Sequence, residues 1–339
     1  MNPLDRRIFL VLTMVFALSA CNNSTQVVKP NPPSANQSAA LPSTIPLQYQ
    51  KRASTQSGAF QKPGELQPAV EFWSKTYTVW HRSEVAFHDD RYLDVVYEVM
   101  LLPGNVDDSL TTDQKEIVKK RRDFWKVQLS ILESKIRYNA PLNANDKQII
   151  SKLKSNGRQL NSLIIGASER VRSQRGTRER FKQGLDISRK YDRQFRKIFR
   201  EAGLPEDLAC LPHVESSFQP SAKSSAGAVG MWQFTKGAAK TFMPSGNGVD
   251  QRLDPFASAN GAARYLSHAY QKLGDWPTAI TSYNHGIGGM KRAQNQVGHD
   301  FVRIVDTYNG PAFGFASRNY YAQFLAAREI ASNPRQYFP

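Results

Sequence analysis

Apolar residues recur at helical spacing along most of the chain from Val70 onward. In one segment the apolar face consists of Val118, Trp125, Leu129, Leu132 and Ile136, and in a later segment of Ile187, Tyr191, Phe195, Ile198 and Phe199. Residues three, four and seven apart share one side of an α-helix, so both segments are predicted to be amphipathic helices. No stretch alternates apolar and polar residues over a useful strand length. The pattern therefore predicts an all-α fold.

Local signals place several helix boundaries. Thr111, followed three residues later by Gln114, predicts a capping box at a helix start. The apolar residues between 149 and 164 predict another long helix, with Gly157 as a break point. Gly203 is placed to end the helix that contains Phe199, and Pro205 is typical of the first turn of the next one.

The first twenty residues have the three parts of an export signal. Arg6 and Arg7 precede an apolar run at residues 8–18, and two small residues follow it. The run is too short to span the roughly 30 Å hydrocarbon core of a membrane. Residues 18–21, Leu-Ser-Ala-Cys, resemble a bacterial lipobox, which implies that Cys21 becomes the lipidated first residue of the mature protein. Residues 5–10 also resemble a twin-arginine signal, so the export route stays open.

The domain organisation follows from composition. Residues 1–20 are the export signal, and residues 21–68, rich in Pro, Ser, Gln and Asn after Cys21, are expected to be a disordered tether. A helical accessory region without recognisable chemistry is expected at 69–175, and a second helical domain at 176–339. Asn22 is not the aspartate associated with inner-membrane retention. We therefore expect the protein to be lipid-anchored to the outer membrane, facing the periplasm.

Charge and cysteine content narrow the possible partners. The chain has 45 Lys and Arg against 29 Asp and Glu, a net charge of +16, which attracts nucleic acid, anionic membranes or anionic wall polymers. The export signal argues against nucleic acid, so we expect no such partner, and protein partners are unknown. A basic run at residues 115–122 is more typical of a solvated helix face than of a binding site. If Cys21 carries lipid, Cys210 is left without a disulfide partner.

The motifs that can carry chemistry lie between residues 204 and 330. Glu215 ends a short apolar segment, and Pro212 inside it breaks a local rule of helices, as residues at functional sites often do. Residues 227–234, Gly-Ala-Val-Gly-Met-Trp-Gln-Phe, combine two glycines suited to a tight turn with two flat aromatic side chains. Asp254 and Pro255 suit a helix start. Residues 282–286, Ser-Tyr-Asn-His-Gly, follow a further helix.

In this order the motifs resemble the lytic transglycosylase family with the soluble lytic transglycosylase domain, whose members are relatives of goose-type lysozyme. The matching residues are Glu215-Ser216, residues 227–234, residues 250–255, Tyr283-Asn284-x-Gly286 and residues 320–327. The resemblance covers roughly the last 160 residues, about one domain, and is greatest to the membrane-bound lipoprotein members. Met231 and Ser282 stand where Leu and Ala are common. The resemblance implies a lysozyme-like catalytic domain at 176–339 that acts on peptidoglycan glycan strands.

The resemblance also implies a substrate-assisted reaction with Glu215 as the one catalytic residue. Protonated Glu215 donates to the glycosidic oxygen between N-acetylmuramic acid and N-acetylglucosamine, while the muramic N-acetyl carbonyl oxygen stabilises the cationic centre. Ionised Glu215 then deprotonates the C6 hydroxyl, which attacks C1 and leaves a 1,6-anhydromuramic end. Most other glycosidases use two carboxylates. The acid has to be protonated near neutral pH, which an apolar pocket favours.

The other candidate site residues have predicted roles in substrate binding. They are Ser216, Trp232, Gln233, Phe234, Tyr283 and Asn284. Ser216 and Gln233 have an alternative role in satisfying backbone groups, and Tyr283 in core packing. Asp250, Arg252 and Asp254 fit a structural set of caps and ion pairs better than a catalytic set. His213 and His285 make a poor metal site, and no metal or nucleotide motif is present, so we expect no cofactor.

Two rival functions remain open at this stage. A hydrolytic muramidase of the same superfamily would let water end the reaction, and its inverting form needs a second carboxylate roughly 6.5–9.5 Å away. Asp250, Asp254 or Asp275 would have to supply it. The second rival is a non-enzymatic, peptidoglycan-binding lipoprotein.

Overall fold

The computed structural model describes residues 58–154, 158–243 and 250–339. Its strands are β1 (Glu84–Asp89), β2 (Val96–Leu101) and β3 (Val171–Arg175). Its helices are α2 (Gln67–Thr78), α3 (Thr112–Arg137), α4 (Ala144–Leu153), α5 (Leu160–Ile164), α6 (Arg178–Ser188), α7 (Asp192–Glu201), α8 (Leu211–Glu215), α9 (Lys236–Phe242), α10 (Pro255–Leu273), α11 (Trp276–His285), α12 (Ile287–Val297), α13 (Phe301–Thr307), α14 (Phe315–Ser332) and α15 (Pro334–Tyr337). Short 3-10 helices lie between them, among them Glu206–Cys210 just before α8. The described chain is mainly helical, in agreement with the all-α prediction.

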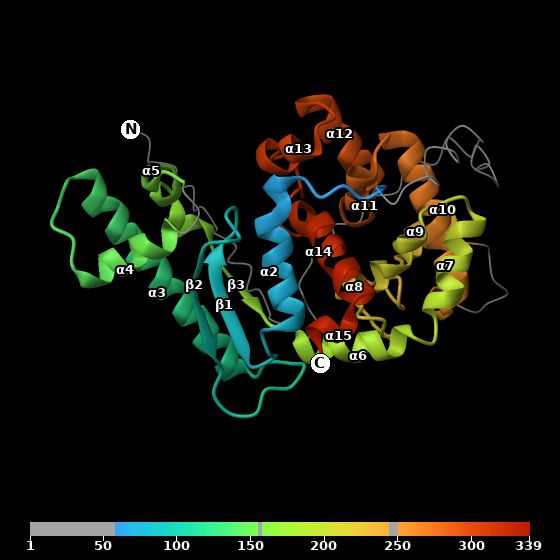
Figure 1. Ribbon diagram of the computed structural model, residues 1–339, viewed down its shortest axis with the longest axis horizontal. Helices are drawn as coiled ribbons and strands as arrows, with labels where there is room; N and C mark the ends of the chain where they lie inside the picture. Colours follow the sequence, from blue (N-terminus) through green and yellow to red (C-terminus); the bar gives the residue numbers. More distant parts are fainter. Residues whose placement is uncertain (1–57, 155–157, 244–249) are drawn as a thin grey trace, which may run out of the picture.

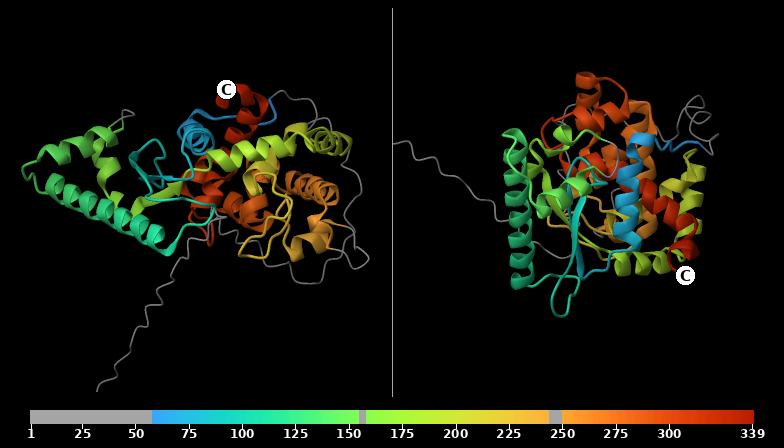
Figure 2. Two further views of the ribbon diagram at one scale, coloured as in Figure 1. Left: turned by 90° about the horizontal axis from the view of Figure 1, so that it is seen from below. Right: turned by 60° about the vertical axis from the view of Figure 1, so that its left-hand side comes forward.

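The described chain forms two lobes with separate hydrophobic cores. The smaller lobe holds the sheet and α3 to α5, and the larger lobe holds α2 and α6 to α15 (Figure 1). The long helix α3 runs along the outside of the smaller lobe, which extends away from the larger one (Figure 2). No helix in the described part of the chain is long and apolar enough to cross a membrane.

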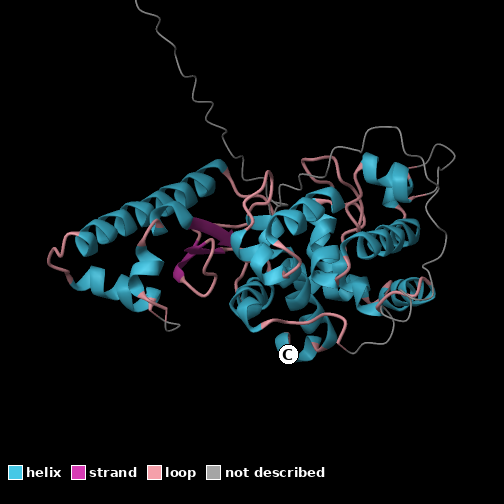
Figure 3. Cartoon of the chain, turned by 90° about the horizontal axis from the view of Figure 1, so that it is seen from above, coloured by secondary structure: helices cyan, strands magenta, loops and turns pink. Residues whose placement is uncertain are grey.

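A three-stranded antiparallel sheet forms the side of the smaller lobe that faces the larger lobe, which corrects the prediction that the chain has no strands (Figure 3). The strand order is β2-β1-β3. Val85 and Phe87 of β1 point into the smaller core, whereas Ala86 belongs to the larger core. On that second face, His88 packs with its ring centroid 4.5 Å from that of Phe72. Because both faces of β1 are covered, its sequence does not alternate between apolar and polar residues.

The capping box predicted at the start of a helix in the smaller lobe is confirmed. Thr111 Oγ1 accepts a hydrogen bond from the backbone N–H of Gln114, and Gln114 Oε1 accepts one from the N–H of Thr111, which completes the predicted capping box. The predicted helix between 149 and 164 is two helices, α4 and α5. Gly157, the predicted break point, lies outside the described residues.

Packed structure begins earlier than the expected end of the tether. Phe60 is buried, with its ring centroid 5.0 Å from that of Phe324. Helix α2, expected in the accessory region, packs on α14 instead: Trp73 Nε1 donates to Asn319 Oδ1 and Tyr77 Oη donates to Gln323 Oε1, both over 3.3 Å. The larger lobe is therefore assembled from both ends of the described chain.

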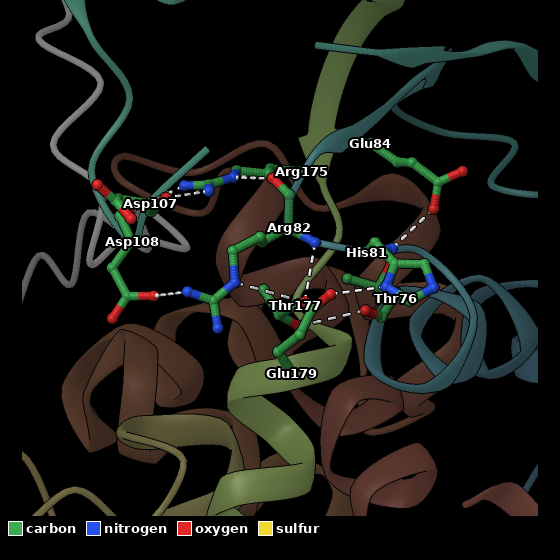
Figure 4. A network of polar contacts seen from close by, with 9 residues as sticks. All are labelled: Thr76, His81, Arg82, Glu84, Asp107, Asp108, Arg175, Thr177 and Glu179. Atoms are coloured by element: carbon green, nitrogen blue, oxygen red, sulfur yellow. Dashed lines mark hydrogen bonds and ion pairs between the residues drawn. The ribbon is translucent and has the colours of Figure 1, made fainter. Parts of the chain in front are cut away.

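A network of polar contacts fixes α6 where the chain leaves the sheet (Figure 4). The carboxylate of Glu179 accepts a hydrogen bond from the backbone N–H of Arg82 and lies 2.6 Å from His81 Nδ1. Arg175 Nε donates to the carbonyl oxygen of Arg82 over 2.5 Å. Further along α6, a Cβ on Gly184 would lie 2.7 Å from the carbonyl oxygen of Ser217. Only glycine at this position lets α6 approach the turn that follows Glu215.

Candidate active site

Glu215 is the last residue of α8, directly before a sharp change in chain direction. The next two residues after Ser216, Ser217 and Phe218, have φ of 52° and 58°, and the N–H groups of Ser216 and Phe218 both donate to the carbonyl oxygen of Pro212. Pro212 lies at the start of α8, where its missing N–H costs no helical hydrogen bond. It is therefore no break of a local rule, contrary to our reading of the sequence. The turn leaves Glu215 partly exposed at the end of its helix.

A buried tyrosine holds the carboxyl group of Glu215. The hydroxyl of Tyr320, in α14, donates a hydrogen bond of 2.5 Å to Glu215 Oε1. Tyr320 is only 1% exposed, and burial raises its pKa well above the ordinary value, with the charge of Glu215 adding to the effect. Tyr320 therefore stays protonated and acts as a donor. This residue was part of a matching motif in the sequence, but its contact with Glu215 was not foreseen.

Two further tyrosines surround the same carboxyl group. Burial raises the pKa of both Tyr283 and Tyr265, and the charge of Glu215 contributes to each shift. Tyr283 Oη donates to the carbonyl oxygen of Trp232 over 2.8 Å, and Tyr265 Oη donates to that of Ser282 over 2.6 Å. Tyr283 thus packs in the core, which is the alternative that the sequence left open, and it lies near enough to Glu215 to feel its charge. Tyr265 was missed because it sits inside an ordinary amphipathic helix, α10.

The polar side chains predicted to bind substrate hold the backbone of residues 216–234 in place. Ser216 Oγ donates to the carbonyl oxygen of Met231 over 2.8 Å. Gln233 Nε2 donates to the carbonyl oxygen of Gly230 over 2.8 Å and to that of Ala222 over 3.2 Å. Both side chains are buried. Ser216 and Gln233 thus bind backbone carbonyl groups, which is the alternative role that the sequence left open for them.

The aromatic residues of this loop lie in the core. Trp232 is 0% exposed, with its ring centroid 5.2 Å from that of Phe195 and 5.6 Å from that of Phe199. Phe234 is 2% exposed and meets Tyr283 edge to face. Rings buried to this degree have almost no surface to offer a sugar. Both rings anchor the 227–234 loop to the core of the larger lobe.

Asn284 connects the end of α11 to the start of α14. Its Oδ1 accepts a hydrogen bond of 2.8 Å from Ser317 Oγ, and the residue is 2% exposed. Its Nδ2 has no hydrogen-bond partner in the described part of the chain. A buried amide N–H₂ without a partner is an available donor beside the first turn of α14.

The acidic residues weighed as a second catalytic carboxylate all cap helices. Asp250 accepts from the N–H of Arg252 and pairs with its guanidinium at 2.6 Å, Asp254 accepts from two N–H groups at the start of α10, and Asp275 accepts from the N–H of Thr278. Arg252 in turn donates to the carbonyl oxygens of residues 227 and 234. The expectation of a structural set of caps and ion pairs is confirmed for Asp250, Arg252 and Asp254.

The histidines beside the motifs are packed rather than exposed. His213 stacks on Phe181 with ring centroids 5.1 Å apart, and burial lowers its pKa to about 3. Burial likewise lowers the pKa of His285 to about 4, beside Phe313. Among the described residues, no three His, Cys, Asp or Glu side chains are grouped so as to hold a metal ion.

Comparison with known proteins shows which proteins the chain is similar to. The chain is 34% identical over 127 residues to membrane-bound lytic murein transglycosylase F 2 of Alkalilimnicola ehrlichii, covering 35% of this chain and 27% of the relative. It is 27% identical over 140 residues to membrane-bound lytic murein transglycosylase D of Escherichia coli, covering 41% of this chain and 30% of the relative. The chain thus spans under a third of the length of these two relatives.

A solved structure and a family model complete the comparison. The structure of the 70 kDa soluble lytic transglycosylase of Escherichia coli aligns with 67% of this chain and 47% of its own, at 17% identity and a TM-score of 0.38. Residues 195–301 match the model described as the transglycosylase SLT domain. That range contains Glu215, the 227–234 loop and Tyr283, so the resemblance that the sequence motifs indicated is confirmed for this part of the chain.

Proposed function

We propose that the protein is a lytic transglycosylase that cleaves peptidoglycan glycan strands between N-acetylmuramic acid and N-acetylglucosamine. The observation that carries the proposal is the partly exposed Glu215 carboxyl group, which lies in the segment that matches the SLT model and accepts a hydrogen bond from the buried Tyr320. The two curated relatives named above are lytic murein transglycosylases, which supports the same substrate class.

Glu215 acts twice in the proposed reaction. As an acid it gives its proton to the glycosidic oxygen, the C1–O bond breaks, and the muramic N-acetyl carbonyl oxygen stabilises the cationic C1. As a base it then takes the proton of the C6 hydroxyl of the same sugar. The C6 oxygen bonds to C1, and the products are a 1,6-anhydromuramic end and a free hydroxyl on the departing sugar. No water is consumed, and Glu215 ends protonated as it began.

The surroundings of Glu215 suit this cycle. Tyr320 orients the carboxyl group while it is ionised, since a charge-assisted hydrogen bond is short and directional. The free Nδ2 of Asn284 is a donor of the kind that can hold the N-acetyl carbonyl group. The 227–234 loop is held by the hydrogen bonds of Ser216 and Gln233 to its backbone and by the packing of Trp232 and Phe234.

The intramolecular route is favoured over hydrolysis by the positions of the other acids. Asp250, Asp254 and Asp275 each act as a helix cap, which leaves water without a dedicated base among them. The C6 hydroxyl is already tethered to the reacting sugar, and such tethering gives effective molarities of ~10⁵ M or more. The anhydro product follows.

We further propose that the protein is exported and anchored to the cell envelope through lipid on Cys21, at the outer membrane and facing the periplasm. The lipobox-like sequence and the tether composition support this, as does the description of several relatives as membrane-bound. Residues 1–57, which contain these signals, lie outside the described structure.

Digestion of purified sacculi in oxygen-18 water, followed by mass spectrometry of the fragments, tests the proposal. The expected result is 1,6-anhydromuramic ends without incorporated oxygen-18. Reducing ends that carry oxygen-18 would replace the proposal with a hydrolytic muramidase. Binding to sacculi without any cleavage would replace it with a peptidoglycan-binding lipoprotein.

A further inference from the structure

The segment that carries Glu215 and the helix that carries Tyr320 are joined a second time, away from the site. Asp207 lies in the 3-10 helix Glu206–Cys210, which leads directly into α8. Its Oδ2 accepts a hydrogen bond of 2.5 Å from Arg328 Nε, on α14. Arg328 follows Tyr320 on that helix by about 12 Å along the axis, at 1.5 Å per residue. Helix α14 is therefore joined to the segment 206–215 at two points, by Tyr320 to Glu215 and by Arg328 to Asp207.

Asp207 is itself held rigidly. Arg196 Nη1, on α7, donates to Asp207 Oδ1 over 2.6 Å, so each carboxylate oxygen has its own guanidinium partner. Arg196 is also paired with Asp192 of α7. Asp207 keeps 28% of its side chain exposed and Arg328 keeps 32%, so both are largely screened from water. Burial raises the pKa of Asp207, but the two guanidiniums outweigh it and keep the pKa below its usual range.

The hydrogen bond from Tyr320 to Glu215 depends on the position of α14 relative to α8. If α14 slides or turns by a fraction of a helical turn against α8, the phenolic oxygen leaves hydrogen-bond distance of the carboxylate. Hydrogen bonds to α2 hold α14 within the larger lobe, and the Asp207–Arg328 pair adds a polar contact to the Glu215 segment that resists such rotation against α8.

We propose that Asp207 and Arg328 are positioning residues for the reaction, because their ion pair sets α14 against α8 so that the hydroxyl of Tyr320 meets Glu215. Neither residue touches substrate in this proposal. They act through Tyr320, and the inference rests on the proposed function for its kinetic readout.

A double-mutant cycle on Arg328 and Tyr320 tests this. We expect Arg328→Gln to lower kcat about 10-fold or more, since small misplacements of catalytic groups cost that much, with KM within about twofold. In the Tyr320→Phe background, the same change should lower kcat by less than about twofold, because the contact that it positions is already gone. Arg328→Lys should recover part of the loss by keeping a charge near Asp207.

The matched control is Arg200→Gln, which removes the pair between Arg200 Nη1 and Glu206 Oε1 in the same 3-10 helix. That pair is exposed, with 58% and 40% of the side chains accessible, and its loss should leave kcat unchanged. If Arg328→Gln lowers kcat by the same factor in the wild-type and the Tyr320→Phe backgrounds, the positioning role is refuted. A general loss of stability would produce that result, because it does not depend on the Tyr320 hydroxyl. Should Arg328→Gln not fold, the cycle is run with Arg328→Lys under the same criterion.

A wild-type protein that does not cleave sacculi would refute the proposed function and not the positioning role. In that case the inference is decided by crystal structures of the wild type and Arg328→Gln. A Tyr320–Glu215 distance that lengthens beyond hydrogen bonding in the variant supports it, and an unchanged distance overturns it.

Discussion

Tyr320 donates a 2.5 Å hydrogen bond to Oε1 of Glu215 across 105 residues of sequence. A hydrogen bond to a charged group contributes about 1.5–3 kcal/mol, which corresponds to a factor of about 10–100 in rate if it acts in the transition state. We expect Tyr320→Phe to lower kcat by that factor, measured on purified sacculi. Tyr321→Phe is the control, since the neighbouring hydroxyl donates to the backbone of Gln61 instead. Equal losses in the two variants would contradict a specific role for Tyr320.

Glu215→Gln should abolish turnover while leaving the fold intact. One residue serves as acid and base, and loss of general acid/base catalysis typically costs ~10²–10⁴-fold or more. The release of soluble fragments from sacculi, together with circular dichroism, checks both parts. Glu201→Gln alters an exposed carboxylate paired with Lys197 and should retain full activity. Near-normal digestion by a folded Glu215→Gln protein would remove Glu215 from the catalytic role.

Stability should fall between pH 6.5 and pH 3 in part because of His213. Burial lowers its folded-state pKa to about 3, so over this range the unfolded chain binds a proton that the folded chain does not. The free energy of unfolding therefore decreases as pH falls, by about 1.4 kcal/mol per pH unit at most for one such histidine. Urea unfolding at pH 7 and pH 5 measures this. His213→Phe, which keeps the stack on Phe181, should lose less stability over the interval; an unchanged pH slope would contradict the assignment.

Gly230→Ala should destabilise the protein by about 2–4 kcal/mol. Gly230 has φ of 81°, and a Cβ there would lie 2.1 Å from the carbonyl oxygen of Arg252. Gly237→Ala is the control, because a Cβ at that helical position meets nothing within 4 Å. Thermal unfolding distinguishes them: a large drop in Tm is expected for the first and none for the second. Similar melting temperatures would show that the 227–234 turn tolerates the side chain.

Cys21→Ser should release a soluble protein that still cleaves sacculi in vitro. The lipobox-like residues motivate this, since acyl chains contribute ~0.8 kcal/mol per buried methylene and two chains give stable attachment. Fractionation of cells after a salt wash is the measurement. A variant that stays with the membrane would require an anchor other than Cys21.

Features coded by adjacent residues could be predicted from the sequence. Capping at Thr111 and Asp254 depends on a side chain and on N–H groups within a few residues, and both caps are present. Glu215 could be proposed as the catalytic residue because Glu215-Ser216 is the first of several short motifs that occur in the family's order. The hydrogen bond between Tyr320 and Glu215 could not be predicted, because it joins α14 to α8 across 105 residues of sequence.

Features that depend on burial could not be predicted. The sequence of β1 does not alternate between apolar and polar residues, because a hydrophobic core lies against each of its faces. Only the tertiary structure shows that the larger core packs on the second face. Trp232 and Phe234 looked like surfaces for a sugar because aromatic side chains serve equally well in sites and in cores. Their exposure of 0% and 2% decides for the core.

The packing of α2 on α14 also determines the order in which the protein can fold. Trp73 and Asn319, which meet across that contact, are 246 residues apart. At synthesis rates of about 5–20 residues per second, α14 emerges tens of seconds after α2. Throughout that time the side of α2 that packs on α14 lacks this native partner and is open to chaperones or to other chains, although Tyr77 can already stack on Phe181 of α6. The last helices to be made therefore complete both the larger core and the contact with Glu215.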